Sequence, residues 1–310
     1  MIVVLLVTTV TFVLVHLAPG DPIALLYDRP GIPDAVRQQW RVSQALDRPL
    51  GEQYLRWVSN TLRGDLGYSL AFRRPVADVI ADALPRTLLL VGLALTLSFA
   101  LGIIVAVLQA ERPGGARDRW LGRVFLVLYS VPDFWFALVV LIVFAYRLPI
   151  LPPSGLTDVM YEYMSPAERA IDRMRHLVLP VATLTLLATA AIARYQRSAL
   201  LEVMPSDWMR TAIAKGLSRR RAVRRHALRN ALLPSITLAG LYLPALVSGA
   251  LLIEKVFSWP GMGLLAANAI SSHDYLLVTA VVLVTSIAVA IGALAADLAS
   301  ALADPRIRVG

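Results

Sequence analysis

Six long runs of apolar residues, almost free of charge, divide this sequence into membrane-length pieces. The runs cover residues 1–20, 87–110, 124–146, 177–193, 230–253 and 275–296. A helix of about 20 apolar residues crosses a bilayer core, where backbone polar groups must be satisfied internally. Only 16% of the residues are charged and 57% are hydrophobic, whereas soluble domains carry about a quarter charged residues. The sequence therefore predicts an all-α membrane protein with six transmembrane helices.

The runs and the segments between them give the expected division of the chain. Residues 1–20 form the first transmembrane helix, and residues 21–86 an external loop or small subdomain. Residues 87–303 form a five-helix transmembrane core that includes a cytoplasmic loop at 198–229, and residues 304–310 form a tail. The first run favours a span over a cleaved signal peptide, because it has no basic leading segment and no small-x-small cleavage site.

Basic residues collect in the loops that six alternating spans would place on one side of the membrane. Loop 111–123 carries four arginines, and loop 194–229 carries ten basic residues against two acidic ones. Loop 147–176, on the opposite side, carries four arginines and four acidic residues. By the positive-inside rule both termini are therefore expected in the cytoplasm. The net charge of +9 then reflects membrane orientation, and no nucleic acid partner is predicted.

The most polar stretch of the chain, residues 206–234, lies between two apolar runs. Ser206 is placed to cap a short helix with Asp207 in its first turn, and Gly216 is placed to end it. Apolar residues recur at helical spacing along this helix: Trp208, Met209, Ala212 and Ile213. Ser218 is placed to start a second, arginine-rich helix. This pattern suits docking of a partner at the inner membrane surface, although charged runs between spans are also typical of topology signals.

Two segments of this stretch resemble the EAA loop of ABC importer permeases, in the variant of the dipeptide/oligopeptide/nickel family. They are Thr211-Ala212-x-Ala214-Lys215-Gly216-Leu217 and Arg229-Asn230-Ala231-Leu232-Leu233-Pro234. In that family the loop is the coupling helix that fits a cleft on the ATPase subunit. The resemblance implies this role for Asp207, Trp208, Met209, Arg210, Thr211, Ala212, Ala214, Lys215, Gly216 and Leu217. Arg210 stands where the family has a glutamate, so a salt bridge from that glutamate is not expected.

Four further motifs are similar to the same family, in the same order along the chain. They are His16–Pro22, Arg63–Ser69 with Arg73–Val76, Glu254–Gly263 and Asp304–Arg308. The resemblance implies the type I ABC importer permease architecture, in the plasma (inner) membrane of a bacterium or archaeon. It also implies the partners: a second homologous permease subunit, two ATPase subunits that hold ATP and Mg, and an external substrate-binding protein. The expected cargo is a di- or oligopeptide or a related small solute.

The third apolar run is interrupted by Ser130-Val131-Pro132-Asp133-Phe134-Trp135. Pro132 breaks the helix, and an ionisable residue within a span is costly unless it pairs or meets water. Asp133 therefore either lines a translocation path, together with Ser130, Pro132 and Trp135, or pairs with an arginine or caps a turn as a structural feature. The sequence is compatible with both interpretations.

Two other features accompany the fifth run. Pro234 and Pro244 predict kinks within it. Phe257 and Trp259, which follow it, favour an aromatic anchor at the membrane interface over direct contact with substrate.

Motifs for nucleotide binding and catalysis are missing from the sequence. No Gly-Lys pair exists for a phosphate-binding loop, no cysteine exists, and the four histidines lie far apart. The chain is therefore expected to be a non-catalytic transport subunit that binds no metal and no cofactor. The alternatives are an ATP-independent secondary transporter or channel, which would favour inverted repeats and paired intramembrane charges, and an intramembrane enzyme.

Overall fold

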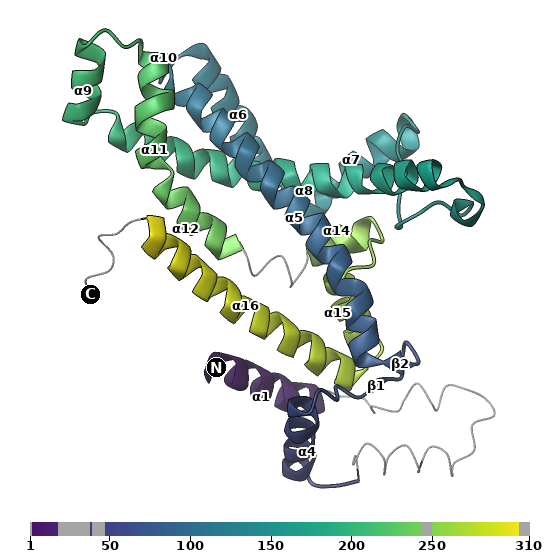
Figure 1. Ribbon diagram of the computed structural model, residues 1–310. Coiled ribbons are helices and arrows are strands. Elements are labelled where there is room, and N and C mark those ends of the chain that lie inside the picture. The colour runs from purple at the N-terminus through teal and green to yellow at the C-terminus, as the bar shows by residue number, and fades with distance from the viewer. Residues whose placement is uncertain (1, 18–37, 39–46, 243–249, 304–310) are drawn as a thin grey trace.

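The computed structural model describes residues 2–17, 38, 47–242 and 250–303, which form an elongated assembly of helices (Figure 1). Three helices in this part of the chain are long and apolar enough to cross a membrane: α5 (Val76–Ala110), α8 (Pro166–Val203) and α16 (Tyr275–Ala303). A fourth crossing is counted if the bent pair α6 (Ala116–Ser130) and α7 (Asp133–Leu141) is one span. The first apolar run forms a shorter helix, α1 (Ile2–Leu17). The fold is a mostly helical membrane fold, and the count of six spans stays a prediction.

Two long helices begin well before the apolar runs from which they were predicted. Helix α5 starts at Val76 and contains Pro85. Helix α8 starts at a capping box: the Ser165 hydroxyl accepts a hydrogen bond from the Glu168 N–H, and the Glu168 carboxylate accepts one from the Ser165 N–H at 2.8 Å. The polar residues before His176 are therefore helical, because local capping, and not hydropathy, sets where the helix begins.

The third apolar run is not one straight helix. Helix α6 ends at Ser130, α7 begins at Asp133, and the two axes are bent by 102°. Val131 has extended backbone angles, and Pro132 has no N–H with which to continue the helical ladder. The predicted break at this motif is confirmed. A π-helical turn, η1 (Ile142–Arg147), follows α7.

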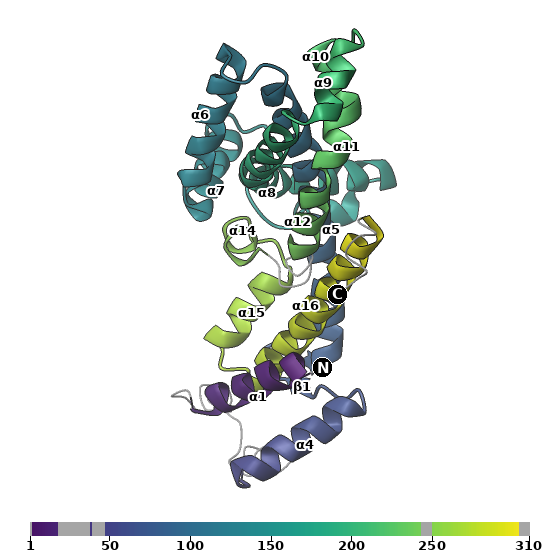
Figure 2. The same cartoon turned by 90° about the vertical axis from the view of Figure 1, so that its left-hand side faces the viewer.

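Helices α5 and α8 pack closely against each other. A Cβ atom on Gly102 would lie 2.6 Å from Cγ2 of Ile192, so only glycine allows the two backbones to approach here. The Ser98 hydroxyl of α5 donates a hydrogen bond to the Thr185 carbonyl of α8 at 3.2 Å. Helix α1 lies beside α16 in both views (Figures 1 and 2).

One end of the molecule carries α4 (Leu50–Leu62) and a small hairpin of β1 (Tyr68–Ser69) and β2 (Arg74–Pro75). The strands pair antiparallel, with Tyr68 opposite Pro75 and Ser69 opposite Arg74. The buried Asp274 carboxylate, just before α16, accepts hydrogen bonds from the Ser69 hydroxyl at 2.6 Å and the Ala71 N–H at 3.1 Å. These bonds fix the hairpin to the start of α16.

The fifth apolar run is described in two parts, α12 (Leu233–Tyr242) and α14 (Leu251–Val256). Helix α11 (Leu228–Ala231) ends just before α12, so the chain breaks its helix next to Pro234, as predicted. The second predicted kink, at Pro244, lies outside the described residues. Helix α15 (Met262–Ser271) follows α14.

The turn between α14 and α15 is buried, and the predicted aromatic anchor at the membrane interface is wrong. Phe257 and Trp259 are both almost fully buried within this chain, and the Trp259 indole N–H donates a hydrogen bond to the Arg86 carbonyl at 3.1 Å. Glu254, with no exposed surface, accepts hydrogen bonds from the Thr87 hydroxyl and the Leu264 N–H, both at 2.9 Å. We call this arrangement the Glu254 turn. Its side chains pack against α5 and are not exposed to lipid.

The opposite end of the molecule carries short helices in the polar stretch (Figure 1). In chain order they are α9 (Asp207–Ala214), α10 (Arg219–Ala222), the π-helical η3 (Val223–Ala227) and α11. The buried sides of these helices pack against the ends of α5 and α8, around a cluster of small and aliphatic residues. A short 3₁₀ turn, η2 (Tyr161–Tyr163), precedes α8.

Candidate functional site

Helix α9 is a short helix with a defined end. Gly216 has φ +91°, a conformation that favours glycine, and it follows the last helical turn. The Leu217 N–H donates to the Ala212 carbonyl at 3.2 Å, and the Gly216 N–H donates to the Ile213 carbonyl at 2.9 Å. This pair of bonds is a Schellman motif, and it satisfies carbonyls that the helix end would leave unpaired. The predicted helix end at Gly216 is confirmed.

The predicted start of α9 is correct in position but not in chemistry. Ser206 occupies the N-cap position with extended backbone angles, but its side chain accepts no bond from the helix. Its hydroxyl instead donates to the Val203 carbonyl at 2.7 Å. Ser206 therefore joins α9 to the end of α8. Ser218 likewise precedes α10 without a capping bond from its side chain.

The apolar side of α9 divides into an inner and an outer part. Met209 has no exposed surface and packs into the cluster formed by α5, α8 and η3, with Leu217 against the same cluster. Trp208 and Ile213 remain 40% and 42% exposed. A short helix that is anchored by one methionine and presents a tryptophan and an isoleucine outward is suited to contact another protein.

The remaining residues predicted for this helix lie on or near its outer side. The exposed ones are Asp207, Arg210, Thr211, Ala214, Lys215 and Gly216, and Ala212 is half-buried. Arg210 and Asp207 approach to 3.6 Å, but both side chains are exposed, so the pair adds little stability.

Glu111 ties the arginine-rich helices to the end of α5. Its carboxylate lies 2.7 Å from Nε of Arg224 and 3.4 Å from Nε of Arg220. Glu111 is nearly buried, whereas both arginines are substantially exposed. Helix α10 follows α9 in the sequence and contacts it. The ion pair therefore holds the helices next to α9 against the end of α5.

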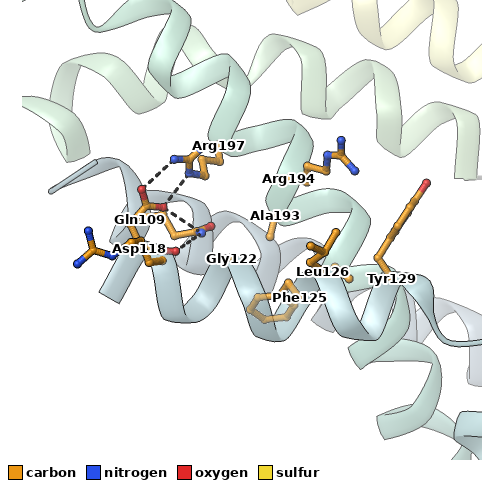
Figure 3. A pocket seen from close by; sticks show the side chains of 11 residues that line it. Gln109, Asp118, Gly122, Phe125, Leu126, Tyr129, Ala193, Arg194 and Arg197 are labelled. Carbon is orange, nitrogen blue, oxygen red and sulfur yellow. Dashed lines mark hydrogen bonds and ion pairs between the residues drawn. The ribbon is translucent and has the colours of Figure 1, made fainter. Parts of the chain in front are cut away.

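A second ion pair, with a buried carboxylate, joins α6 to α8. The Asp118 carboxylate receives two hydrogen bonds from Arg197, Nε at 2.9 Å and a terminal nitrogen at 2.8 Å, and Gln109 donates a third at 3.2 Å (Figure 3). Both charged residues lie outside the apolar runs. The Arg197 guanidinium lowers the pKa of the Asp118 carboxyl, which stays ionised at neutral pH. The pair holds the start of α6 against α8.

A cavity of about 370 Å³ lies at the break between α6 and α7. Its wall includes Asp133, Tyr129, Ser98 and Tyr242, and otherwise it is apolar: Val91, Ala94, Leu95, Leu128, Leu184, Leu187, Ala188, Ala191 and Ala250. Asp133 is exposed, and no arginine or other described residue pairs with it, so an intrachain ion pair of Asp133 is not seen in the described part of the molecule. The interpretation of Asp133 as a cavity residue therefore gains support.

None of the other three residues predicted at this break, Ser130, Pro132 and Trp135, belongs to the wall of this cavity. Ser130 donates its hydroxyl to the Leu126 carbonyl at 2.9 Å, within its own helix. Pro132 caps α7 and Trp135 is about half exposed, but neither belongs to the cavity wall. Tyr129, Ser98 and Tyr242 were missed, because their place beside Asp133 depends on helix packing and not on a local motif.

A second cavity, of about 340 Å³, continues along α6 and α8 (Figure 3). It shares Tyr129 with the first cavity and includes Arg119, Arg194 and Arg197. The Arg194 guanidinium lies 5.9 Å from the centre of the Tyr129 ring, a cation–π geometry. Among the described residues, no group of three or more metal-ligating side chains comes together.

The sequence matches a known protein family along almost its whole length. Residues 98–309 match the binding-protein-dependent transport system inner membrane component, and residues 1–91 match the N-terminal part of such membrane components. The oligopeptide transport system permease protein AppB of Bacillus subtilis is 36% identical over 302 residues, which cover 97% of this chain and 94% of the relative. The dipeptide transport system permease protein DppB of Escherichia coli is 34% identical over 318 residues, with the same coverage of both chains.

The fold also has a solved counterpart. A chain from an inward-facing structure of the MetNI methionine ABC transporter superimposes with a TM-score of 0.58. The match covers 73% of this chain and 96% of that chain, and at 19% identity it speaks for the fold alone. The chain belongs to the family of binding-protein-dependent transport inner membrane components, and it is a non-catalytic permease subunit of an ABC importer.

Proposed function

We propose that this permease imports di- or oligopeptides, or a related small solute, and that α9 is the element through which ATP hydrolysis drives it. The cargo follows from the relatives, which are named as oligopeptide and dipeptide permeases. The observation that carries the coupling role is the division of α9: Met209 is fully buried in the membrane-helix cluster, while Trp208 and Ile213 face outward. A force applied to the outer side is thereby transmitted to α5 and α8.

The proposed complex contains this chain, a second homologous permease, two ATPase subunits and an external substrate-binding protein. ATP and Mg bind to the ATPase subunits and not to this chain. In the proposed topology, six spans cross the membrane and both termini lie in the cytoplasm. Helices α9–α11 are then inside and the hairpin with α4 is outside, and these two regions lie at opposite ends of the molecule (Figure 1). The arginines beside α9 support this orientation. The cavity at Asp133 and Tyr129 is the proposed part of the translocation path, between those two ends.

The alternative of an ATP-independent transporter or channel disagrees with membership of a binding-protein-dependent family. It also makes a different prediction: exposed residues of α9 would have no role in transport.

The test measures ATPase activity of the co-expressed complex in lipid nanodiscs, with and without loaded binding protein. Ile213→Ala removes an exposed apolar side chain from α9, and Trp208→Ala removes the larger one. We expect each to reduce stimulated ATPase activity and import by about tenfold, because a few large side chains that become buried at an interface carry most of its binding energy. Gly216→Pro and Ala212→Asp should abolish stimulation, since they disrupt the helix end and its surface.

A matched control is Ile291→Ala, the same truncation at an exposed position on α16. It should leave stimulation unchanged. If Ile213→Ala and Trp208→Ala behave like Ile291→Ala, or if no ATPase subunit co-purifies with the native chain, the coupling role of α9 is wrong.

A further inference from the structure

Asp133 carries a negative charge into a cavity where this chain offers it no partner. It starts α7, where the positive end of the helix dipole stabilises a carboxylate, and it forms part of the cavity wall at the bend. A carboxylate inside a span needs a partner or water, and none of the described residues of this chain provides an ion pair. Asp133 is therefore available to a cation that enters the cavity.

Arg194 is the matching free charge in the neighbouring cavity. Arg197, one turn further along α8, donates two hydrogen bonds to the Asp118 carboxylate and is therefore already paired. Arg194 is exposed and lies against the face of Tyr129, and no carboxylate among the described residues pairs with it. The groove along α6 and α8 thus presents a free carboxylate, then an aromatic ring, then a free guanidinium.

The spacing of the two cavities suits a short peptide. Residues 184–191 of α8 wall the first cavity and residues 190–197 wall the second, an offset of six residues. At 1.5 Å per residue this offset is about 9 Å along the helix. An extended chain rises about 3.3–3.6 Å per residue, so a peptide of about three residues spans it.

We propose that the groove between α6 and α8 recognises a zwitterionic peptide by both ends, with its α-ammonium group at Asp133 and its α-carboxylate at Arg194. Tyr129 separates the two charges and packs against the peptide backbone. This inference rests on the proposed import of peptides and adds the chemical groups that the path recognises. A guanidinium also suits a carboxylate because its two donors match the two oxygens.

The test is a cycle that pairs a substitution in the permease with removal of one charge from the peptide. Import is measured in proteoliposomes that contain the complete complex, at saturating loaded binding protein, with radiolabelled trialanine and N-acetyl-trialanine. The binding protein is the same in all arms, so its own preference cancels in the ratio of variant to native. Asp133→Asn should slow import of trialanine about fivefold to twentyfold and leave the acetylated peptide within about twofold of native.

A second arm tests the other end of the groove. Arg194→Gln should slow import of trialanine by a similar factor, but not that of trialanine amide, which lacks the carboxylate. Asp133→Glu and Arg194→Lys keep the charges and should restore at least half of the native rate. If Asp133→Asn prevents assembly of the complex, the Arg194 arm alone decides the proposal.

The outcomes separate this inference from the proposed function. Equal slowing of both peptides, or no slowing of either, overturns the inference and assigns Asp133 to structure or to pairing with another subunit. If the native complex imports no peptide although loaded binding protein stimulates its ATPase, then the proposed cargo fails as well. If the native complex imports peptide but neither variant distinguishes the charged peptide from the one that lacks a charge, only the inference is refuted.

Discussion

Replacement of Gly261 by alanine is a severe test of the Glu254 turn. Gly261 is the N-cap of α15, with a φ that any residue can adopt, and its N–H donates to the Trp259 carbonyl at 2.8 Å. A Cβ added there would overlap the Thr87 hydroxyl and would lie 2.6 Å from an oxygen of the Glu254 carboxyl group. Thr87 and Glu254 are both fully buried and bonded to each other, so neither side chain has space to move away.

The expected cost follows from two terms. Forcing a methyl group into a filled core costs about 1–3 kcal/mol, and loss of the Thr87–Glu254 hydrogen bond costs about 1–2 kcal/mol. The total of about 2–5 kcal/mol corresponds to a fall in Tm on the order of 10 °C for a chain of this size. The hydroxyl of Thr87 also accepts the Met262 N–H at 2.7 Å, so the start of α15 should loosen too.

The assay is thermal unfolding of the detergent-purified complex, monitored by tryptophan fluorescence. Gly51→Ala is the matched control, because a Cβ at Gly51 meets nothing within 4 Å and the residue lies in helix α4. It should leave Tm unchanged or raise it slightly. The double variant Thr87→Ala with Gly261→Ala should lose less than the sum of the single variants, because one of the clashing atoms is gone. A Gly261→Ala protein with native Tm would refute the packing described for this turn.

Three further predictions concern the coupling end. Met209→Ala should destabilise the docking of α9 by about 2–5 kcal/mol, seen as faster tryptic cleavage at Arg210 and Lys215, whereas Met209→Leu should be cleaved at the native rate. In a double-mutant cycle of Glu111→Gln with Arg224→Gln, the coupling energy in thermal unfolding should be about 1 kcal/mol, because Arg224 is half-exposed; a value of zero would remove this contact as a tie. Arg197 lowers the folded-state pKa of Asp118, so the pair stabilises the protein above the unfolded pKa of about 4 and loses that contribution as pH falls below it. The difference in Tm between native protein and Asp118→Asn should therefore be full at pH 7 and shrink at pH 3, and a difference independent of pH would contradict the assignment.

Local signals in the sequence were sufficient for the features that depend on few neighbouring residues. Pro132 predicted the break between α6 and α7, because a missing N–H acts on its own helix. Gly216 predicted the end of α9, because the left-handed conformation after a helix favours glycine. The apolar spacing of residues 208–213 predicted the helix itself. Each of these effects operates within one or two helical turns.

Features that depend on contacts between distant segments could not be predicted in the same way. Glu254 meets Thr87 across 167 positions, and Arg197 meets Asp118 across 79. From composition, Phe257 and Trp259 looked like interface anchors, because hydropathy does not distinguish an aromatic side chain in lipid from one in a protein core. Asp133 was recognised as an ionisable residue within a span, but its neighbours Tyr129 and Tyr242 in the cavity come from two different helices.

The contacts along α5 explain how a displacement at α9 would reach the cavity. Helix α5 is bound to the Glu254 turn at Thr87, to α8 at Ser98 and to the arginine-rich helices at Glu111. The Ser98 bond and the close packing at Gly102 hold α5 and α8 against each other. The break before α7 differs, because Pro132 leaves the helical ladder open there. The cavity lies between α5, α8 and the break, so its shape would depend on how far the proposed movement of α9 displaces α5 and α8 relative to α6 and α7.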